Sequence, residues 1–115
     1  MPHLQLEYSD NLSIDTQPLL AALHQTLCQS GVFSPVNIKC RARACANYYC
    51  DTHCPAFAHI TLSIISGRDA TVKHTITTAL LATLQAHLPT APAGTQMSVD
   101  LRDMQSEWYA KVTAT

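Results

Sequence analysis

The stretch that decides the fold is AFAHITLSIISGRD, residues 56–69. Apolar residues at every second position predict a strand over residues 56–65 with one buried face. Ser-Gly-Arg-Asp then turns the chain, and Asp69 is a typical N-cap residue. Apolar side chains recur at helical spacing beyond it, which predicts a helix from about residue 70 to residue 88. The side chains expected on the buried face of the strand are Ala58, Ile60, Leu62 and Ile64.

The first half of the chain has the same order of elements. Residues 3–8 alternate between apolar and polar side chains, as a half-buried strand does. A helix follows, with Ser13 or Asp15 as its cap and Gly31 as its C-terminal stop. Residues 36–46 then alternate again. This half therefore predicts a β-α-β unit.

A final alternating segment at residues 97–102 makes the second half a β-α-β unit as well. The two units indicate an internal repeat of about 55 residues. We expect one domain over residues 1–115, because this length fits one domain but hardly two. Its expected parts are repeat 1 at about 2–46, a connecting loop at 47–55, repeat 2 at about 56–103 and a C-terminal segment at 104–115.

The predicted fold class is α/β (α+β), a two-layer sandwich of tandem β-α-β repeats. Each crossover helix makes the two strands that it joins parallel. Four strands and two helices then give a four-stranded mixed sheet with both helices on one face. The other face would be bare in a monomer, so we expect the chain to assemble.

Composition narrows the class of partner. Charged residues make up 13% of the chain and the net charge is −1, with no basic block, so we expect no nucleic-acid partner. So little charge on a small domain favours an oligomer. The longest nearly apolar run is about half a membrane span, so we expect no membrane insertion. No signal-peptide pattern is visible at the N-terminus, which predicts a cytoplasmic protein.

Four of the five cysteines lie between Cys40 and Cys54, close to His53. Such density is a feature of zinc sites, but no two of these cysteines have the spacing usual in a zinc knuckle. An odd number without an export signal also argues against a disulfide framework. We expect reduced thiols and no bound metal or cofactor, with zinc as the alternative.

The start of the chain predicts a catalytic group. Met1 is followed by Pro2, and methionine aminopeptidases remove Met before a small residue. The mature chain would then begin with a secondary amine, whose pKa of about 7.7–8.0 is lowered by an apolar pocket or by nearby cations. A general base works best with a pKa near the operating pH. Pro2 is therefore the candidate catalytic residue.

Four motifs are informative together: Pro2-His3, the cationic strand Ile38-Lys39-Cys40-Arg41, the block from Ala56 to Leu62, and Ser66-Gly67-Arg68. They resemble 5-carboxymethyl-2-hydroxymuconate isomerase, of the tautomerase superfamily that includes 4-oxalocrotonate tautomerase and macrophage migration inhibitory factor. The resemblance spans nearly the whole chain. It implies a homotrimer and a cofactor-free isomerisation of a carboxylate-bearing dienol in homoprotocatechuate breakdown.

The same resemblance assigns roles to single residues. Pro2 would move the proton, and Arg68 would bind a substrate carboxylate. Lys39 stands where the family carries Arg, so it keeps the charge but loses the two-pronged hydrogen bond. Arg41 matches a family Arg on the same strand face and is the alternative cation. His59 also matches the family block, and we expect it to be structural.

Some questions stay open at this level. Tyr48, Tyr49, Phe57 and Trp108 are candidates to wall the pocket, although core packing is the better default for each. Lys39 and the cysteine-rich loop depart from the family pattern. They leave room for another enol or dicarboxylate substrate, or for a non-catalytic binding protein on the same trimeric scaffold.

Overall fold

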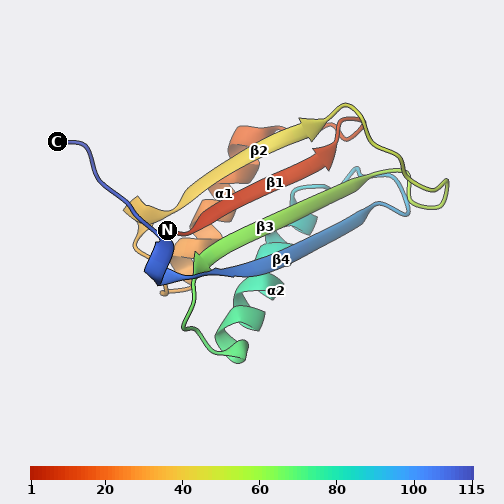
Figure 1. Ribbon diagram of the computed structural model, residues 1–115. Helices are drawn as coiled ribbons and strands as arrows, with labels where there is room; N and C mark the ends of the chain where they lie inside the picture. The colour runs from red at the N-terminus through yellow and green to blue at the C-terminus, as the bar shows by residue number, and fades with distance from the viewer.

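The computed structural model describes residues 1–115 as four strands and two helices, with short 3-10 helices at Pro35–Asn37 and Ser106–Trp108. The strands and helices follow one another as two β-α-β units (Figure 1). In chain order they are β1 (His3–Ser9), α1 (Thr16–Gln29), β2 (Lys39–Cys45), β3 (Phe57–Ile65), α2 (Ala70–Ala86) and β4 (Gln96–Met104).

The strands form one mixed sheet in the order β2-β1-β3-β4. Each unit contributes a parallel pair, β1 with β2 and β3 with β4, while the central pair β1 and β3 is antiparallel. Both helices cover the same face of the sheet (Figure 1). The predicted mixed sheet with two helices on one face is confirmed.

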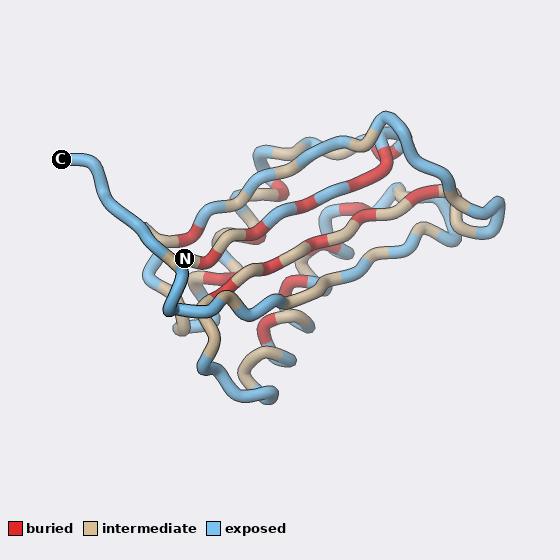
Figure 2. The backbone as a smooth tube through the Cα atoms, in the orientation of Figure 1, coloured by how far each residue is buried: buried red, intermediate tan, exposed pale blue.

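The core lies between this face and the helices. Side chains of alternate positions on the central strands β1 and β3 are buried there, against one stripe of each helix (Figure 2). The opposite face of the sheet is polar, with side chains such as Gln5, Glu7 and Arg41 exposed. The fully buried leucines and isoleucines are Leu4, Leu6, Leu19, Leu23, Leu27, Ile60, Leu62, Ile64, Leu80 and Leu84.

Helix ends follow the predicted signals with one exception. The Asp69 carboxylate accepts a hydrogen bond of 2.9 Å from the N–H of Val72 and so caps α2. Asp15 occupies the N-cap position of α1, but its side chain makes no capping bond. Gly31 follows α1 with φ of +72°, the left-handed conformation that ends helices.

Two element boundaries differ from the predictions. Strand β2 begins at Lys39, later than expected, because Pro35 starts a 3-10 helix that runs to Asn37. Helix α2 ends at Ala86, although Leu88 beyond it stays buried against the core. Apolar periodicity therefore continued past the last helical residue.

The connecting loop at 47–55 lies at the end of the sheet far from the N-terminus. Tyr8 pairs with Ala58 and His3 with Ser63, so the chain enters β3 at the opposite end from Pro2. The aromatic rings of Tyr48 and Phe57 pack edge to face there, with centroids 6.1 Å apart. Within the protomer these two rings therefore lie away from Pro2, and Tyr48 is exposed rather than in the core position that was its default.

The cysteines form neither a disulfide nor a metal cluster. All five cysteines are unpaired, and no three His, Cys, Asp or Glu side chains lie together as a metal site requires. His59 donates or accepts a hydrogen bond of 2.6 Å with Ser98 across β3 and β4, the structural role expected for it. No helix of the chain combines the length and the apolar character needed to cross a membrane.

Candidate active site

Pro2 lies at the head of β1 and is fully buried. Its carbonyl oxygen accepts a hydrogen bond of 3.1 Å from the N–H of Lys39, which joins the starts of β1 and β2. Met1 precedes it in this structure, so the Pro2 nitrogen is an amide here and the free amine belongs to Met1. The Pro2 nitrogen, which is expected to titrate after Met1 removal, thus belongs to a buried ring and lies beside a cationic strand.

Asn37 organises the groups around this amine. Its carbonyl oxygen accepts hydrogen bonds from the Met1 amine, at 3.0 Å, and from Lys39 Nζ, at 2.9 Å. Its side-chain oxygen accepts a third bond, at 2.9 Å, from Lys111 Nζ. One residue therefore brings together two lysines and the amine from positions far apart in the sequence.

This environment lowers the pKa of the N-terminal amine below its ordinary value of 8.0. Partial burial is the largest cause, because it disfavours the charged form. The positive charges of Lys39 and then Lys111 act in the same direction, as does a hydrogen bond from Lys39. An amine held here is more often neutral at neutral pH, which a general base requires.

Arg68 shares a cavity with the N-terminus. The cavity has a volume of about 200 Å³ and is lined by Met1, Asn37 and Arg68, with Phe33 and Ile64 among its apolar walls. The guanidinium group is exposed and donates to the carbonyl oxygen of Val32, at 3.3 Å. The site residues predicted at positions 2 and 68 therefore lie at one end of the sheet.

Arg41 lies one step further from the amine than Lys39 does. Its Nη1 atom is 3.2 Å from Nδ1 of His3. Because a guanidinium only donates, Nδ1 must accept, so His3 is neutral with its proton on Nε2. The pKa of His3 is lowered accordingly, first by partial burial and then by the charge of Arg41.

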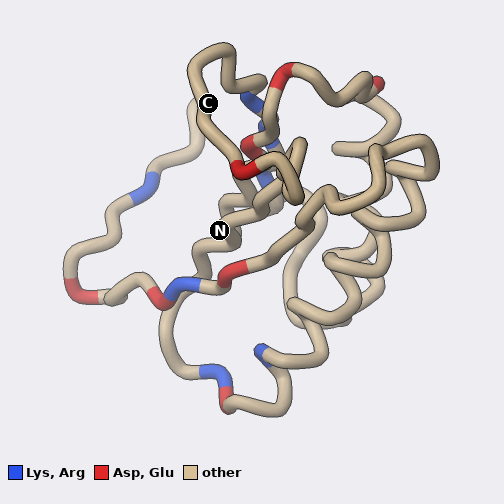
Figure 3. Tube along the Cα trace, turned by 90° about the vertical axis from the view of Figure 1, so that its right-hand side faces the viewer, with Lys and Arg blue, Asp and Glu red and all other residues tan.

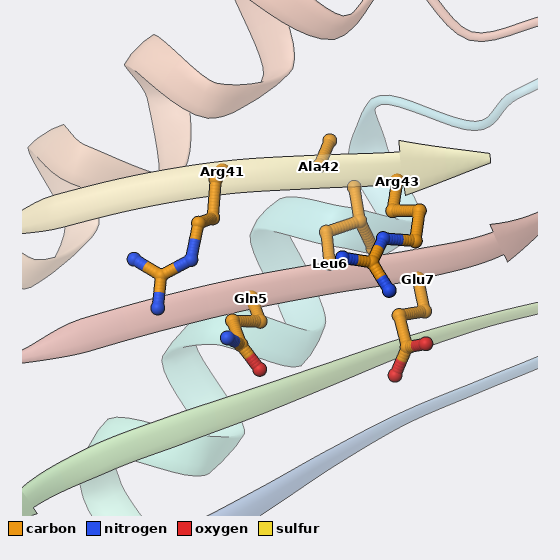
Figure 4. Close-up of a pocket in the computed structure, with 6 residues that line it drawn as sticks. All are labelled: Gln5, Leu6, Glu7, Arg41, Ala42 and Arg43. Atoms are coloured by element: carbon orange, nitrogen blue, oxygen red, sulfur yellow. The ribbon is translucent and has the colours of Figure 1, made fainter.

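A second cationic pair lies along the same strand. Arg41 and Arg43 line a cleft of about 290 Å³ on the open face of the sheet, with Gln5 and Glu7 opposite them (Figure 4). Glu7 and Arg43 are register partners across β1 and β2. Arg43 thus has an acidic neighbour, unlike the cations near Pro2.

The cations near Pro2 have no acidic partner. The ion pairs of the structure are Lys73 with Asp103, Arg102 with Asp100, and His53 with Asp51. Lys39, Arg41, Arg68 and Lys111 are in none of them; Figure 3 marks the charged positions along the chain. Unpaired cations around a cavity favour the binding of anions.

Sequence reasoning missed Asn37 and Lys111. Asn37 has a weak signal, since it is a polar residue two positions before the cationic strand. Lys111 has no local signal, because it lies in an irregular segment beyond β4. Only the fold brings it to Asn37.

Comparison with known proteins shows the family of the chain. The model of a family described as CHMI: 5-carboxymethyl-2-hydroxymuconate isomerase matches residues 2–114. A solved 5-carboxymethyl-2-hydroxymuconate isomerase from Deinococcus radiodurans R1 is similar at 32% identity and a TM-score of 0.85, with 98% of this chain and 90% of that chain covered. The comparison with curated proteins gave no match.

Two more distant structures show the fold. A 5-carboxymethyl-2-hydroxymuconate delta-isomerase has 18% identity and a TM-score of 0.79, over 99% of this chain and 89% of that chain. A fused 4-OT, described as a symmetric trimer, has 22% identity and a TM-score of 0.72, over 90% of this chain and 85% of that chain. The chain has the tautomerase fold and belongs to the 5-carboxymethyl-2-hydroxymuconate isomerase family.

Proposed function

We propose that this chain, once Met1 is removed, is a cofactor-independent isomerase with Pro2 as general base and acid. Its substrate would be 5-carboxymethyl-2-hydroxymuconate, converted from a dienol to a conjugated enone in homoprotocatechuate breakdown. The observation that carries the proposal is the meeting of a buried proline, the Met1 amine, whose pKa this environment lowers, and unpaired cations at one end of the sheet. Family membership supports the reaction class.

The proposed step is a proton transfer in two parts. The neutral amine of Pro2 takes the proton of the 2-hydroxyl group, and the electrons left on that oxygen form the carbonyl while the double bonds shift along the chain. The protonated amine then returns the proton to a carbon of the conjugated system. The intermediate is a dienolate, so fixed positive charge near its oxygen lowers the barrier.

The cations take separate roles in this proposal. Arg68 shares the cavity of the N-terminus and would bind one substrate carboxylate with its two-pronged guanidinium group. Lys39, which lies beside the amine, would stabilise the developing oxyanion. Arg41 would bind substrate less directly, because its guanidinium group contacts His3, whereas Lys39 and Lys111 are the cations that lower the pKa of the amine. The geometry therefore favours Lys39 over Arg41 next to the reacting atoms.

We further propose that residues 1–115 form one domain of a homotrimer in the cytoplasm. Only 19 of 115 residues are buried in the isolated chain, and large apolar side chains such as Val36, Trp108 and Val112 are exposed. Surface of this kind favours assembly. The similar fused 4-OT is described as a trimer. A sedimentation mass of one chain at micromolar concentration would contradict the proposal.

The test of function is ultraviolet-monitored turnover of 5-carboxymethyl-2-hydroxymuconate by protein whose first residue is confirmed by mass spectrometry as Pro2. Pro2→Ala and Arg68→Ala should each reduce turnover with the fold intact, since positioned proton transfer contributes about 10²–10⁴-fold. Lys73→Gln removes a cation on α2 outside the site and should leave turnover unchanged. Rates like those of the wild type in both site variants would refute the assignment.

Lys39 favours one alternative within the same fold. A lysine cannot form the two-pronged bond that an arginine makes with a carboxylate, so another enol or dicarboxylate substrate is the second candidate. A panel that includes phenylpyruvate would separate the two, because only the second candidate predicts faster turnover of the alternative substrate. Binding of dicarboxylates with no turnover of any enol would indicate a binding protein instead.

A further inference from the structure

A second cleft lies beside the head of β1 and shares Asn37 with the Arg68 cavity. Its volume is about 720 Å³, and it lies between the start of β2 and the C-terminal segment. Asn37 lines both spaces, whereas Met1 lines only the Arg68 cavity and His3 lines only this cleft, so the two spaces meet beside the head of β1. The residues that line the cleft are His3, Val36, Asn37, Lys39, Tyr109, Ala110, Lys111, Val112 and Thr113.

Two lysines face this cleft without a carboxylate between them. Lys39 Nζ and Lys111 Nζ each donate a hydrogen bond of 2.9 Å to a different oxygen of Asn37. Each ammonium group has three donors, so these bonds leave most of them free. Like charges gathered around one neutral residue repel each other, and an anion placed between them would relieve that repulsion.

We propose that the C-terminal segment completes a carboxylate subsite, in which Lys111 binds one carboxylate of the substrate while the charge of Lys39 beside it faces the developing oxyanion. Arg68 would bind a second carboxylate in the neighbouring cavity. A substrate with carboxylates at both ends would then reach from one cavity to the other past Asn37, while a monocarboxylate would occupy only one of them. The identity of the natural ligand rests on the proposed function, but the subsite itself rests on the cleft and its lysines.

The direct test uses adipate, a saturated dicarboxylate that cannot react. Its affinity for the assembled protein that begins at Pro2 is measured at low salt by NMR titration. Lys111→Gln should weaken adipate binding by about threefold to tenfold, as expected for a partly screened charge-assisted contact. Lys111→Arg, which keeps the charge, should remain within about twofold of the wild type. Lys73→Gln is the matched control and should leave adipate affinity unchanged.

Two results would overturn the subsite. In the first, wild-type protein shows no saturable adipate binding, or Lys111→Gln binds adipate as Lys73→Gln does. In the second, Lys111→Arg weakens binding as much as Lys111→Gln, which would make Lys111 only an anchor of the C-terminal segment. Hexanoate, a monocarboxylate of equal length, should bind more weakly than adipate and should lose less affinity in Lys111→Gln.

Kinetics then separate this inference from the proposed function. Lys111→Gln should raise KM for the dienol more than it lowers kcat, because the lysine binds a carboxylate that does not react. If wild-type protein binds adipate through Lys111 but does not isomerise the dienol, the subsite stands and the proposed function fails. If the dienol is isomerised with a KM that Lys111→Gln leaves unchanged, the proposed function stands and the subsite fails.

Discussion

Gly94→Ala tests the packing of the distal loops against each other. Gly94 has φ of +91°, and a Cβ atom added there would lie 2.5 Å from the carbonyl oxygen of His53 and 3.2 Å from Cδ of Pro55. Gly31 is a matched control, because it has φ of +72° but a Cβ atom added to it would meet nothing within 4 Å. The two substitutions share the conformational strain and differ in the clash.

The expected magnitudes follow from these two terms. An alanine forced into the left-handed region costs about 1–2 kcal/mol, partly offset by about 0.4–1 kcal/mol because alanine restricts the unfolded chain. Gly31→Ala should therefore reduce the free energy of unfolding by about 1 kcal/mol. Overpacking against backbone adds about 1–3 kcal/mol, so Gly94→Ala should lose about 2–4 kcal/mol.

Urea unfolding at one fixed protein concentration measures both values, since assembly makes apparent stability depend on concentration. Turnover of the dienol by folded Gly94→Ala should remain close to that of the wild type, because the connecting loop lies at the end of the sheet far from Pro2. A Gly94→Ala protein as stable as Gly31→Ala would refute the close approach of the two loops.

Three further predictions concern single groups. Asp69→Ala should lower the free energy of unfolding by about 0.5–2 kcal/mol in urea, because it removes the α2 cap, whereas Asp15→Ala should cost less because that side chain caps nothing. The pKa of His3 is lower in the folded chain than its unfolded value of 6.5, so its contribution to stability is fully present above pH 6.5 and is lost as pH falls through the folded pKa. His3→Gln should therefore flatten the fall of the urea midpoint below pH 6.5. An unchanged slope would contradict this. Burial raises the pKa of Cys40 from 9.0 to about 11, so its thiolate fraction at pH 8 should be about a hundredfold lower than in the unfolded chain, and mass spectrometry should find slow alkylation by iodoacetamide that urea accelerates.

The elements were predictable because each carries a local physical signal. Alternation of apolar residues marked β1 and β3, whose inward positions are buried, and helical spacing marked the buried stripes of α1 and α2. The boundary at Lys39 was not predictable from alternation, since Pro35–Asn37 form a helical turn inside an alternating stretch. The place of Tyr48 and Phe57 depended on strand order, which local patterns do not encode.

Strand order also explains why the candidate site gathers residues from distant positions. β1 and β2 are parallel, so Lys39 at the start of β2 lies beside Pro2. β1 and β3 are antiparallel, so the end of β3 returns to the same place and the following turn brings Arg68 there. The sequence predicted the parallel pairs, but the antiparallel centre is what completes the cavity.

The same reasoning accounts for Lys111. β4 is parallel to β3, and the N–H of Ser66 donates to the carbonyl oxygen of Met104 at 2.9 Å, so both strands end beside the head of β1. Any chain that continues beyond β4 must therefore start near the N-terminus, and here it places Lys111 on Asn37. The tandem repeat thus supplies Lys39 from the start of β2, and Arg68 and Lys111 from beyond the ends of β3 and β4. A repeat with a parallel centre would have separated these groups by the length of the sheet, so the antiparallel pairing of the two units is the feature on which the proposed chemistry depends.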